Sequence, residues 1–266
     1  MRALPQDNLA YPVLIILNTG SMGTGCVINA VEGNYLATAK HVLFDEKNNL
    51  KGNVAILKSY TPDLVATDFT KFTLDLNIVT SNSNIIAHTN HDVCLVRLLT
   101  KDDQGNSTHT PGVTLDNLSS RGVCGININT TVKMYQDVLI SNDVFIFGYP
   151  ASIGLRNSPQ FNSEIPLLRK GIVAGKNDQN STIILDCPVY QGNSGGPVIE
   201  VEHMPGGISY KLIGLVSQFV PVEDHWKNLS FGIVNTQWSN SGYSVVVPVD
   251  FINDLINQLN ATTTTP

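Results

Sequence analysis

The stretch CPVYQGNSGGPVIE, residues 187–200, places one serine among three glycines and two prolines within an otherwise apolar run. Gly192, Gly195 and Gly196 permit backbone conformations and close approaches that a side chain would forbid. Two interpretations fit. Asn-Ser-Gly-Gly suits a tight turn between two strands. A serine on a strained glycine-rich loop, with backbone N–H groups turned outward, suits a nucleophile. The remainder of the sequence has to decide between them.

Composition limits the classes of protein to which the chain can belong. Hydrophobic residues make up 42% of its 266 residues, enough for sizeable cores, and charged residues only 14%. The net charge of -6, without a Lys/Arg block, argues against a nucleic-acid partner. No run approaches the ~20 apolar residues that would cross a bilayer, so we expect no membrane partner. The length suits one large β domain or two packed ones.

The N-terminal patch AYPVLIIL lacks a basic region before it and a small-residue cleavage site, so it predicts a buried strand rather than a signal peptide. Cys26, Cys94, Cys124 and Cys187 form no CxxC pair and are expected to be buried thiols. Together these features predict a cytoplasmic protein. No cofactor is expected.

Short β-type runs bounded by Gly, Asn, Asp and Pro recur along the chain, and no long helical pattern alternates with them. They predict an all-β chain of sandwich or barrel type. One helix is expected in VDFINDLINQLN, residues 249–260, where apolar residues share a face and Asp250 is a candidate N-cap. The polar stretch 100–121 is interpreted as a connector between two halves. The clearest runs are YPVLIIL, GCVIN, YLATA, VAILK, DVCLVRL, DVFIFGYP, STIILD, GPVIEV, KLIGLVSQF and YSVVVPV.

A serine nucleophile needs a base, and the base needs an orienting acid. Of the six histidines, His41 alone follows directly on a predicted buried strand, in YLATAKHVL, where an imidazole can be held rigidly. Asp92 opens the run DVCLVRL, so its carboxylate is expected at the lip of an apolar strand. An aspartate there is also common strand punctuation.

At these residues the chain resembles the trypsin-like (chymotrypsin-fold) serine proteases, in their non-zymogen intracellular or bacterial-type branch. TAKH around His41, HDVCLVRL with Asp92 and GNSGGP with Ser194 match the family's three motifs in its chain order. FGYP (147–150) and LIGLVSQ (212–218) match strands of its second barrel.

The resemblance extends over most of the chain and implies two antiparallel six-stranded β-barrels, followed by a C-terminal helix. The first barrel would span residues 11–124 and carry His41 and Asp92. The second would span 125–260 and carry Ser194. The active site would lie in the cleft between them.

The resemblance also implies the roles of the site residues. Ser194 attacks the acyl carbon, His41 transfers the proton and Asp92 holds the imidazole. The N–H groups of Gly192 and Ser194 form the oxyanion hole. Ser217 supports the aspartate, and the strand from Ser217 pairs with the substrate backbone. The substrate-binding set is Pro188, Val189, Tyr190, Gln191, Ser217, Gln218 and Phe219.

The predicted function is therefore that of a serine endopeptidase acting on a protein or peptide, with any regulatory partner unidentified. The alternative is a catalytically silent module of the same fold that binds a peptide or partner. None of the residues placed at the specificity pocket is charged. They predict a preference for an uncharged, small or medium apolar residue on the acyl side of the cut.

The chain departs from the family pattern in two respects. Val42 and Tyr190 stand where secreted members carry disulfide cysteines. Asn193 stands where the zymogens carry an aspartate, which pairs with an N-terminal amine freed by cleavage. Because an asparagine cannot supply that charge, we expect activity without N-terminal processing.

The segment HTNHDVC offers a competing interpretation, because His88, His91 and Cys94 stand at metal-like spacings. In a strand, however, His91 and Cys94 would point to opposite faces, and no fourth ligand is evident. A zinc site is the less favoured interpretation.

Overall fold

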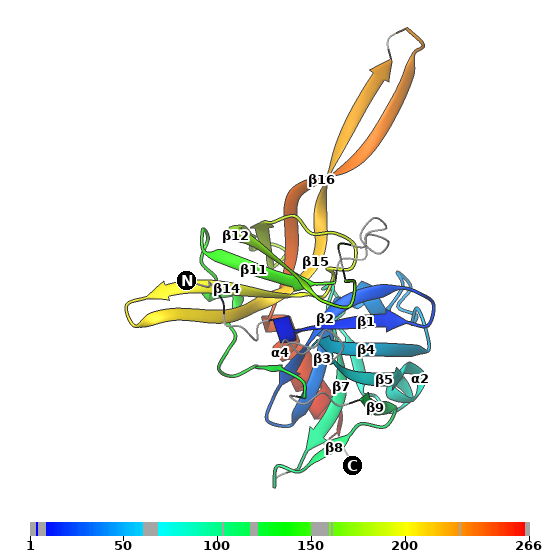
Figure 1. Ribbon diagram of the computed structural model, residues 1–266, viewed down its shortest axis with the longest axis vertical. Coiled ribbons are helices and arrows are strands. Elements are labelled where there is room, and N and C mark those ends of the chain that lie inside the picture. The colour runs from blue at the N-terminus through cyan, green and yellow to red at the C-terminus, as the bar shows by residue number, and fades with distance from the viewer. Residues whose placement is uncertain are drawn as a thin grey trace.

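The structure, a computed structural model, describes residues 4, 9–60, 69–102, 104–117, 122–149, 160, 162–228 and 230–263. Across these residues the strands form two packed halves, a long C-terminal helix lies against them, and a two-stranded projection extends from the second half (Figure 1).

The first half is a ten-stranded sheet with the hydrogen-bonded order β6-β7-β3-β2-β1-β4-β5-β9, to which β10 adds beside β2 and β8 beside β7. The β10–β2 pair is parallel, and the other pairs of this sheet are antiparallel. The strands are β1 (Pro12–Leu17), β2 (Met22–Asn29), β3 (Gly33–Thr38), β4 (Val54–Tyr60), β5 (Phe69–Asp75), β6 (Ile85–Ala87), β7 (Cys94–Lys101), β8 (Ser107–His109), β9 (Val113–Asn117) and β10 (Gly125–Asn127).

The sheet curves around a core of its own. Alternate residues of β1, namely Val13, Ile15 and Leu17, belong to this core, as the two-residue period of a strand requires. Two short helices, α1 (Lys40–Leu43) and α2 (Leu76–Ser81), connect strands at its margins. The Asp75 carboxylate caps α2 by accepting the N–H groups of its first turn.

The second half is a closed six-stranded barrel with the order β11-β12-β13-β16-β15-β14, all pairs antiparallel. Its interior is a separate apolar cluster that includes Ile146, Leu185 and Val246. A 3₁₀ turn, η2 (Tyr135–Asp137), precedes it. The strands are β11 (Asp143–Gly148), β12 (Leu167–Asn177), β13 (Thr182–Asp186), β14 (Pro197–Met204), β15 (Gly207–Asn228) and β16 (Ile233–Pro248).

The predicted C-terminal helix is α4 (Asp250–Thr263). Its apolar face, with Ile252, Leu255, Ile256 and Leu259, packs into a third core to which both halves contribute. The Asp250 carboxylate accepts the N–H of Tyr135 at 2.8 Å and so ties the start of the helix to η2. Helix α4 therefore lies where it stabilises the contact between the halves.

The expected all-β architecture with two β domains and a C-terminal helix is confirmed. The first half has more strands than the six expected. The interpretation of residues 100–121 as a connector was wrong for β8 and β9, which belong to the first sheet. Both are short edge strands with mostly exposed side chains, a pattern that resembles a loop in sequence. Residues 103 and 118–121 of that stretch lie outside the described residues, as does Pro150 of FGYP.

Strands β15 and β16 continue past the barrel as a two-stranded hairpin, residues 221–240, here named the arm (Figure 1). The runs predicted from the sequence did not include it. None of the helices in the described ranges has the length and apolar character needed to traverse a bilayer.

Candidate active site

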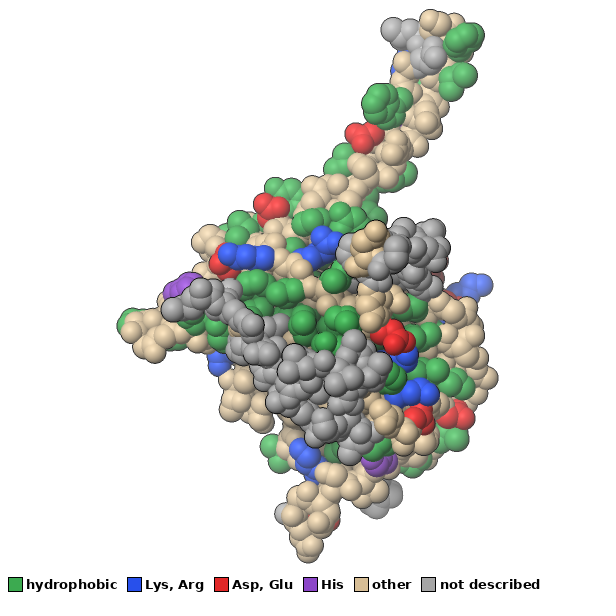
Figure 2. All heavy atoms as spheres, viewed as in Figure 1, with side chains coloured by type: hydrophobic (Ala, Val, Ile, Leu, Met, Phe, Trp, Pro, Cys, Tyr) green, Lys and Arg blue, Asp and Glu red, His purple; other side chains and the backbone are tan. Residues whose placement is uncertain are grey.

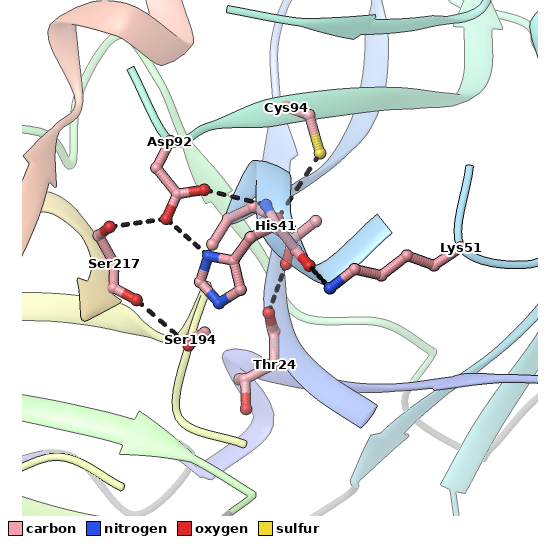
Figure 3. Close-up of polar contacts among 9 residues, drawn as sticks. Thr24, His41, Lys51, Asp92, Cys94, Ser194 and Ser217 are labelled. Atoms are coloured by element: carbon pink, nitrogen blue, oxygen red, sulfur yellow. Dashed lines mark hydrogen bonds and ion pairs between the residues drawn. The ribbon is translucent and has the colours of Figure 1, made fainter. Parts of the chain in front are cut away.

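His41 lies one residue into α1, directly after β3. Val42 and Leu43 are buried and anchor this short helix to the first core, which fixes the backbone of His41. The His41 N–H donates to Asp92 Oδ1 at 2.9 Å, and its ring Nδ1 lies 2.7 Å from Asp92 Oδ2 (Figure 3). In the tautomer protonated at Nδ1, the carboxylate thus holds both the backbone and the ring of His41.

Asp92 lies two residues before β7 and accepts a third hydrogen bond, from Ser217 Oγ to Oδ2 at 2.6 Å. Burial on its own would raise the pKa of this carboxyl. The hydrogen bonds from His41 and Ser217 and the charge of His41 outweigh burial and lower the pKa below its usual value. Asp92 is therefore held in its ionised form, beside the imidazole.

Ser194 lies on the glycine-rich loop between β13 and β14. Gly192 and Gly195 have positive φ angles of 94° and 81°, which side chains rarely adopt. A Cβ at Gly195 would also lie 2.1 Å from Thr24 O, so this position requires glycine for space as well. The conformational demands expected of this loop are confirmed.

The Ser194 hydroxyl donates to Ser217 O at 3.2 Å. Figure 3 shows the His41 ring between Asp92 and Ser194. Among the hydrogen bonds of the described residues, none joins Ser194 to His41. The structure thus brings the three predicted residues into one place, with the serine in a conformation turned toward β15.

Two backbone N–H groups of the loop, those of Gly192 and Ser194, are available to a ligand. Asn193 N–H donates to Tyr190 O at 3.0 Å and closes a turn in which Gly192 is the third residue. Among the described residues, no protein acceptor receives a hydrogen bond from the N–H of Gly192 or of Ser194. These are the two donors that the resemblance assigns to an oxyanion hole.

Thr24, at the start of β2, anchors the loop from the opposite half. It is fully buried, its hydroxyl donates to Gly192 O at 2.6 Å, and it accepts the N–H of Tyr149 at 3.0 Å. Its own N–H donates to Ser194 O at 2.9 Å. Sequence reasoning missed Thr24, because a threonine in a predicted strand carries no sign that it will contact a loop 168 residues away.

A cleft of about 830 Å³ contains His41, Asp92 and Ser194. Of the predicted substrate-binding residues, Pro188 is not part of its lining. Residues that sequence reasoning missed come from the segment before β7, from the β12–β13 turn with the start of β13, and from β16. The predicted residues that line it are Val189, Tyr190, Gln191, Ser217, Gln218 and Phe219, and the others include Asn90, His91, Gln179, Asn180, Ser181, Thr182, Val245 and Val247.

The residues that precede Ser194 on the loop differ in their surroundings. Val189 is buried and its carbonyl accepts Asn240 Nδ2–H at 2.7 Å. The Tyr190 ring is stacked by the Arg169 guanidinium, 4.5 Å from its centroid. Asn193 is buried, and its Oδ1 has no hydrogen-bond partner among the described residues.

The segment that suggested zinc has other contacts. His88 Nδ1 accepts the N–H groups of Asn90 and His91, and the His91 ring stacks on Phe251 of α4 at 3.6 Å. Cys94 is buried against Ala39 O. Within the portion of the chain that is described, no three His, Cys, Asp or Glu side chains are grouped to hold a metal ion.

Cys26, Cys94 and Cys187 form no disulfide. Cys26, Cys94 and Cys187 are buried, as expected, whereas Cys124 is only half-buried. Burial raises the pKa of Cys26 to about 12 and that of Cys187 to about 11, and it raises the pKa of Cys94 as well. These thiols are therefore held in their unreactive, protonated form.

In sequence, the trypsin-like peptidase domain family matches residues 23–206, a span that contains His41, Asp92 and Ser194 and ends before the arm. No curated protein matches the sequence significantly.

Several solved protease structures are similar in fold. A serine endoprotease from Yersinia pestis aligns with a TM-score of 0.51 at 16% identity, over 97% of this chain and 65% of its own. The protease Anisep from Arthrobacter nicotinovorans aligns with a TM-score of 0.54 at 17% identity, over 94% of each chain. The thermostable serine protease AL20 from an extremophilic microorganism aligns with a TM-score of 0.53 at 15% identity, over 98% of this chain and 100% of its own. This chain thus spans less than two thirds of the Yersinia enzyme and nearly all of the other two.

Proposed function

The chain belongs to the trypsin-like peptidase family, and from this membership we propose that it is a serine endopeptidase that hydrolyses peptide bonds of a protein substrate with Ser194, His41 and Asp92 as its catalytic residues. The observation that carries the proposal is the hydrogen-bonded chain from Ser217 through Asp92 to His41, in the cleft that also contains Ser194. A module that only binds peptides needs no ionised carboxylate behind an imidazole.

The proposed reaction begins when Ser194 turns about its Cα–Cβ bond from Ser217 O toward the free ring nitrogen of His41. Hydrogen bonds between catalytic groups are often loose without substrate and tighten when it binds. His41 Nε2 accepts the hydroxyl proton as Ser194 Oγ attacks the substrate carbonyl carbon. The charge of Asp92 stabilises the imidazolium that forms.

The tetrahedral intermediate places a negative charge on the former carbonyl oxygen. The N–H groups of Gly192 and Ser194 donate to it, and one such donor is worth on the order of 10²–10³ in kcat. His41 then protonates the leaving amine, and the acyl-enzyme forms. Water, deprotonated by His41, releases the acyl product and restores Ser194.

The cleft lining supports an apolar preference next to the cut. Val189, Val245 and Val247 are aliphatic, and the lining residues Tyr190 and Gln191 are uncharged. The guanidinium of Arg169 behind Tyr190 would repel a basic side chain. We expect peptide-library profiling to return uncharged, small or medium apolar residues at the acyl position. Selection of Lys/Arg or Asp/Glu there would contradict this specificity.

A fluorophosphonate probe tests the catalytic assignment, since it labels only an activated serine. Labelling of Ser194 is expected in the wild type and is expected to be lost in His41→Ala. The matched control is His91→Ala, because His91 lines the same cleft but stacks on Phe251. Labelling that survives His41→Ala, or a wild type that is never labelled, would favour the silent binding module instead.

A further inference from the structure

The arm exposes large apolar side chains to solvent. Trp226 and Trp238 are 65% and 63% exposed, and Phe231 near the turn is 78% exposed. Figure 2 shows such side chains along the arm and at its tip. A two-stranded hairpin is at best marginally stable alone in water, so an arm of this composition is expected to have a partner.

The arm is continuous with the cleft. Strand β15 pairs with β14 as far as Leu215, and Val216 still exchanges hydrogen bonds with Gly195 and Gly196. At the next residue, Ser217, the position of the neighbouring strand is taken by Ser194. From there to Asn228, β15 pairs only with β16 among the described strands, so its other edge begins at the nucleophile and continues into the arm.

That edge is a template for another extended chain. Gln218 and Phe219 line the cleft, and residues 221–228 add about 26 Å at roughly 3.3 Å per residue. Register shifts at Ser217 and Val220 bend β15 between the part that lines the cleft and the part in the arm. Along the arm, the edge of β15 offers N–H and C=O groups at alternate residues to another strand.

The two faces of β15 in the arm differ. Val222 and Trp226 project on the face that carries Ser239 and Asn235 of β16, with Asp224 between them hydrogen-bonded to Ser239. The opposite face of β15 carries Glu223, His225 and Lys227. A strand added at this edge would meet the apolar Val222 and Trp226, on either side of Asp224, on one face and only polar side chains on the other.

We propose that the free edge of β15 in the arm binds the acyl-side segment of the substrate, several residues from the cut, as an added β-strand with alternating apolar and polar side chains. This inference rests on the proposed function. The preferred substrate is then a polypeptide with an exposed amphipathic strand, such as an unfolded β-protein. Added strands of this kind gain affinity from main-chain hydrogen bonds and selectivity from alternate side chains.

The continuity of the edge with Ser194 favours a substrate over the two other occupants that an apolar hairpin suggests, a second copy of the chain and a lipid surface. Neither of those needs the β15 edge, and either can engage Trp238, which is nearly as exposed as Trp226. A strand at the β15 edge engages Trp226, whereas Trp238 lies on β16 and projects from the other face, opposite Glu223.

The test compares three fluorogenic peptides that share the residues around the cut. One has about four acyl-side residues, the second adds about eight residues that alternate valine and serine, and the third adds about eight serines, enough to reach along the arm. In the wild type, kcat/KM for the alternating peptide is expected to exceed that of the other two by about tenfold, mainly through KM. Trp226→Ser should remove most of this gain, and Trp238→Ser should keep it. Neither change should alter cleavage of the short peptide.

A shortened arm provides a second variant. In this variant, residues 222–239 are replaced by Asn-Gly, which forms a two-residue hairpin turn between Pro221 and Asn240. The hydrogen bond from Asn240 to Val189 O is retained. This variant should cleave the short peptide normally and lose the preference for the alternating one.

Two kinetic results would overturn the proposal: equal kcat/KM for the three peptides in the wild type, or equal effects of the two tryptophan changes. A dimer in sedimentation that the shortened arm converts to a monomer, with cleavage of the long peptide intact, would also overturn it. So would flotation with phosphatidylcholine vesicles that requires the arm. If no peptide is cut and no probe labels Ser194, the proposed function has failed. Fluorescence anisotropy of the same peptides then tests strand binding at the arm without any cleavage. Tighter binding of the alternating peptide that Trp226→Ser abolishes would support the arm, and equal binding of all three would overturn it.

Discussion

The Thr24 side chain connects the two halves of the molecule at the glycine-rich loop of Ser194 through Gly192 O and the N–H of Tyr149. Thr24→Val keeps the shape of the side chain but leaves both buried groups without a partner, which costs about 1–3 kcal/mol. Since the loop carries the proposed oxyanion donors, kcat is expected to fall about 10- to 100-fold.

Thr24→Ser supplies the control for that change, because it restores the hydroxyl and loses only a methyl group. We expect it to recover most of kcat at unchanged KM. A purely structural threonine would lower the melting temperature in Thr24→Val and leave kcat of the folded fraction at the wild-type value.

Asp92 predicts a pH dependence of stability. Its pKa is lower in the folded protein than the ordinary value of about 3.9, so the unfolded chain binds this proton first as the pH falls. The stabilisation is complete above the unfolded pKa and is lost as the pH falls through the folded pKa. Asp92→Asn removes it. In melts from pH 6 to pH 2.5, wild type and variant should therefore differ most at the upper end and converge toward the lower end. A constant difference would show that Asp92 is not linked to folding in this way.

At the scale of elements, α4 joins the two halves, because its apolar face packs into a core to which both halves contribute. Leu255 is fully buried there. Leu255→Ala is expected to lower the free energy of unfolding by about 2–5 kcal/mol, from lost burial and the cavity left behind. Urea denaturation measures the change.

Ile140→Ala is the matched control for Leu255→Ala, because Ile140 is 56% exposed. Its effect should stay within about 0.5 kcal/mol. If Leu255→Ala were equally mild, α4 would be a surface addition rather than part of the shared core.

For the whole molecule, three cores predict how it opens. Cys94 lies in the core of the first half and Cys187 in that of the second, and the third core joins them. Burial raises the pKa of both thiols, so alkylation at neutral pH reports opening. With iodoacetamide and peptide mass spectrometry, we expect both to become reactive at the same denaturant concentration. Separate midpoints would mean that the shared core does not couple the halves.

Much of this architecture could be predicted from local pattern. The apolar runs predicted ten strands, β1–β4, β7, β11 and β13–β16, but not β5, β6, β8–β10 or β12. The helical spacing of Phe251, Ile252, Leu255, Ile256 and Leu259 predicted α4 with its correct buried face. The trypsin-like family, inferred from the motifs at His41, Asp92 and Ser194, is confirmed by the match over residues 23–206. These features could be predicted because strand and helix periods and glycine requirements are properties of neighbouring residues.

The sequence by itself thus determined the β class, the helix and the residues around which a site could form. Only the tertiary structure decided that Thr24 holds the glycine-rich loop of Ser194, that β8 and β9 extend the first sheet, and that an edge of β15 with no partner among the described strands runs from Ser194 into the arm. The reason is physical. Which groups meet across 168 residues, and which apolar side chains remain in solvent, depend on how strands are paired and packed, and no local pattern distinguishes Trp226 in an exposed arm from a tryptophan in a core.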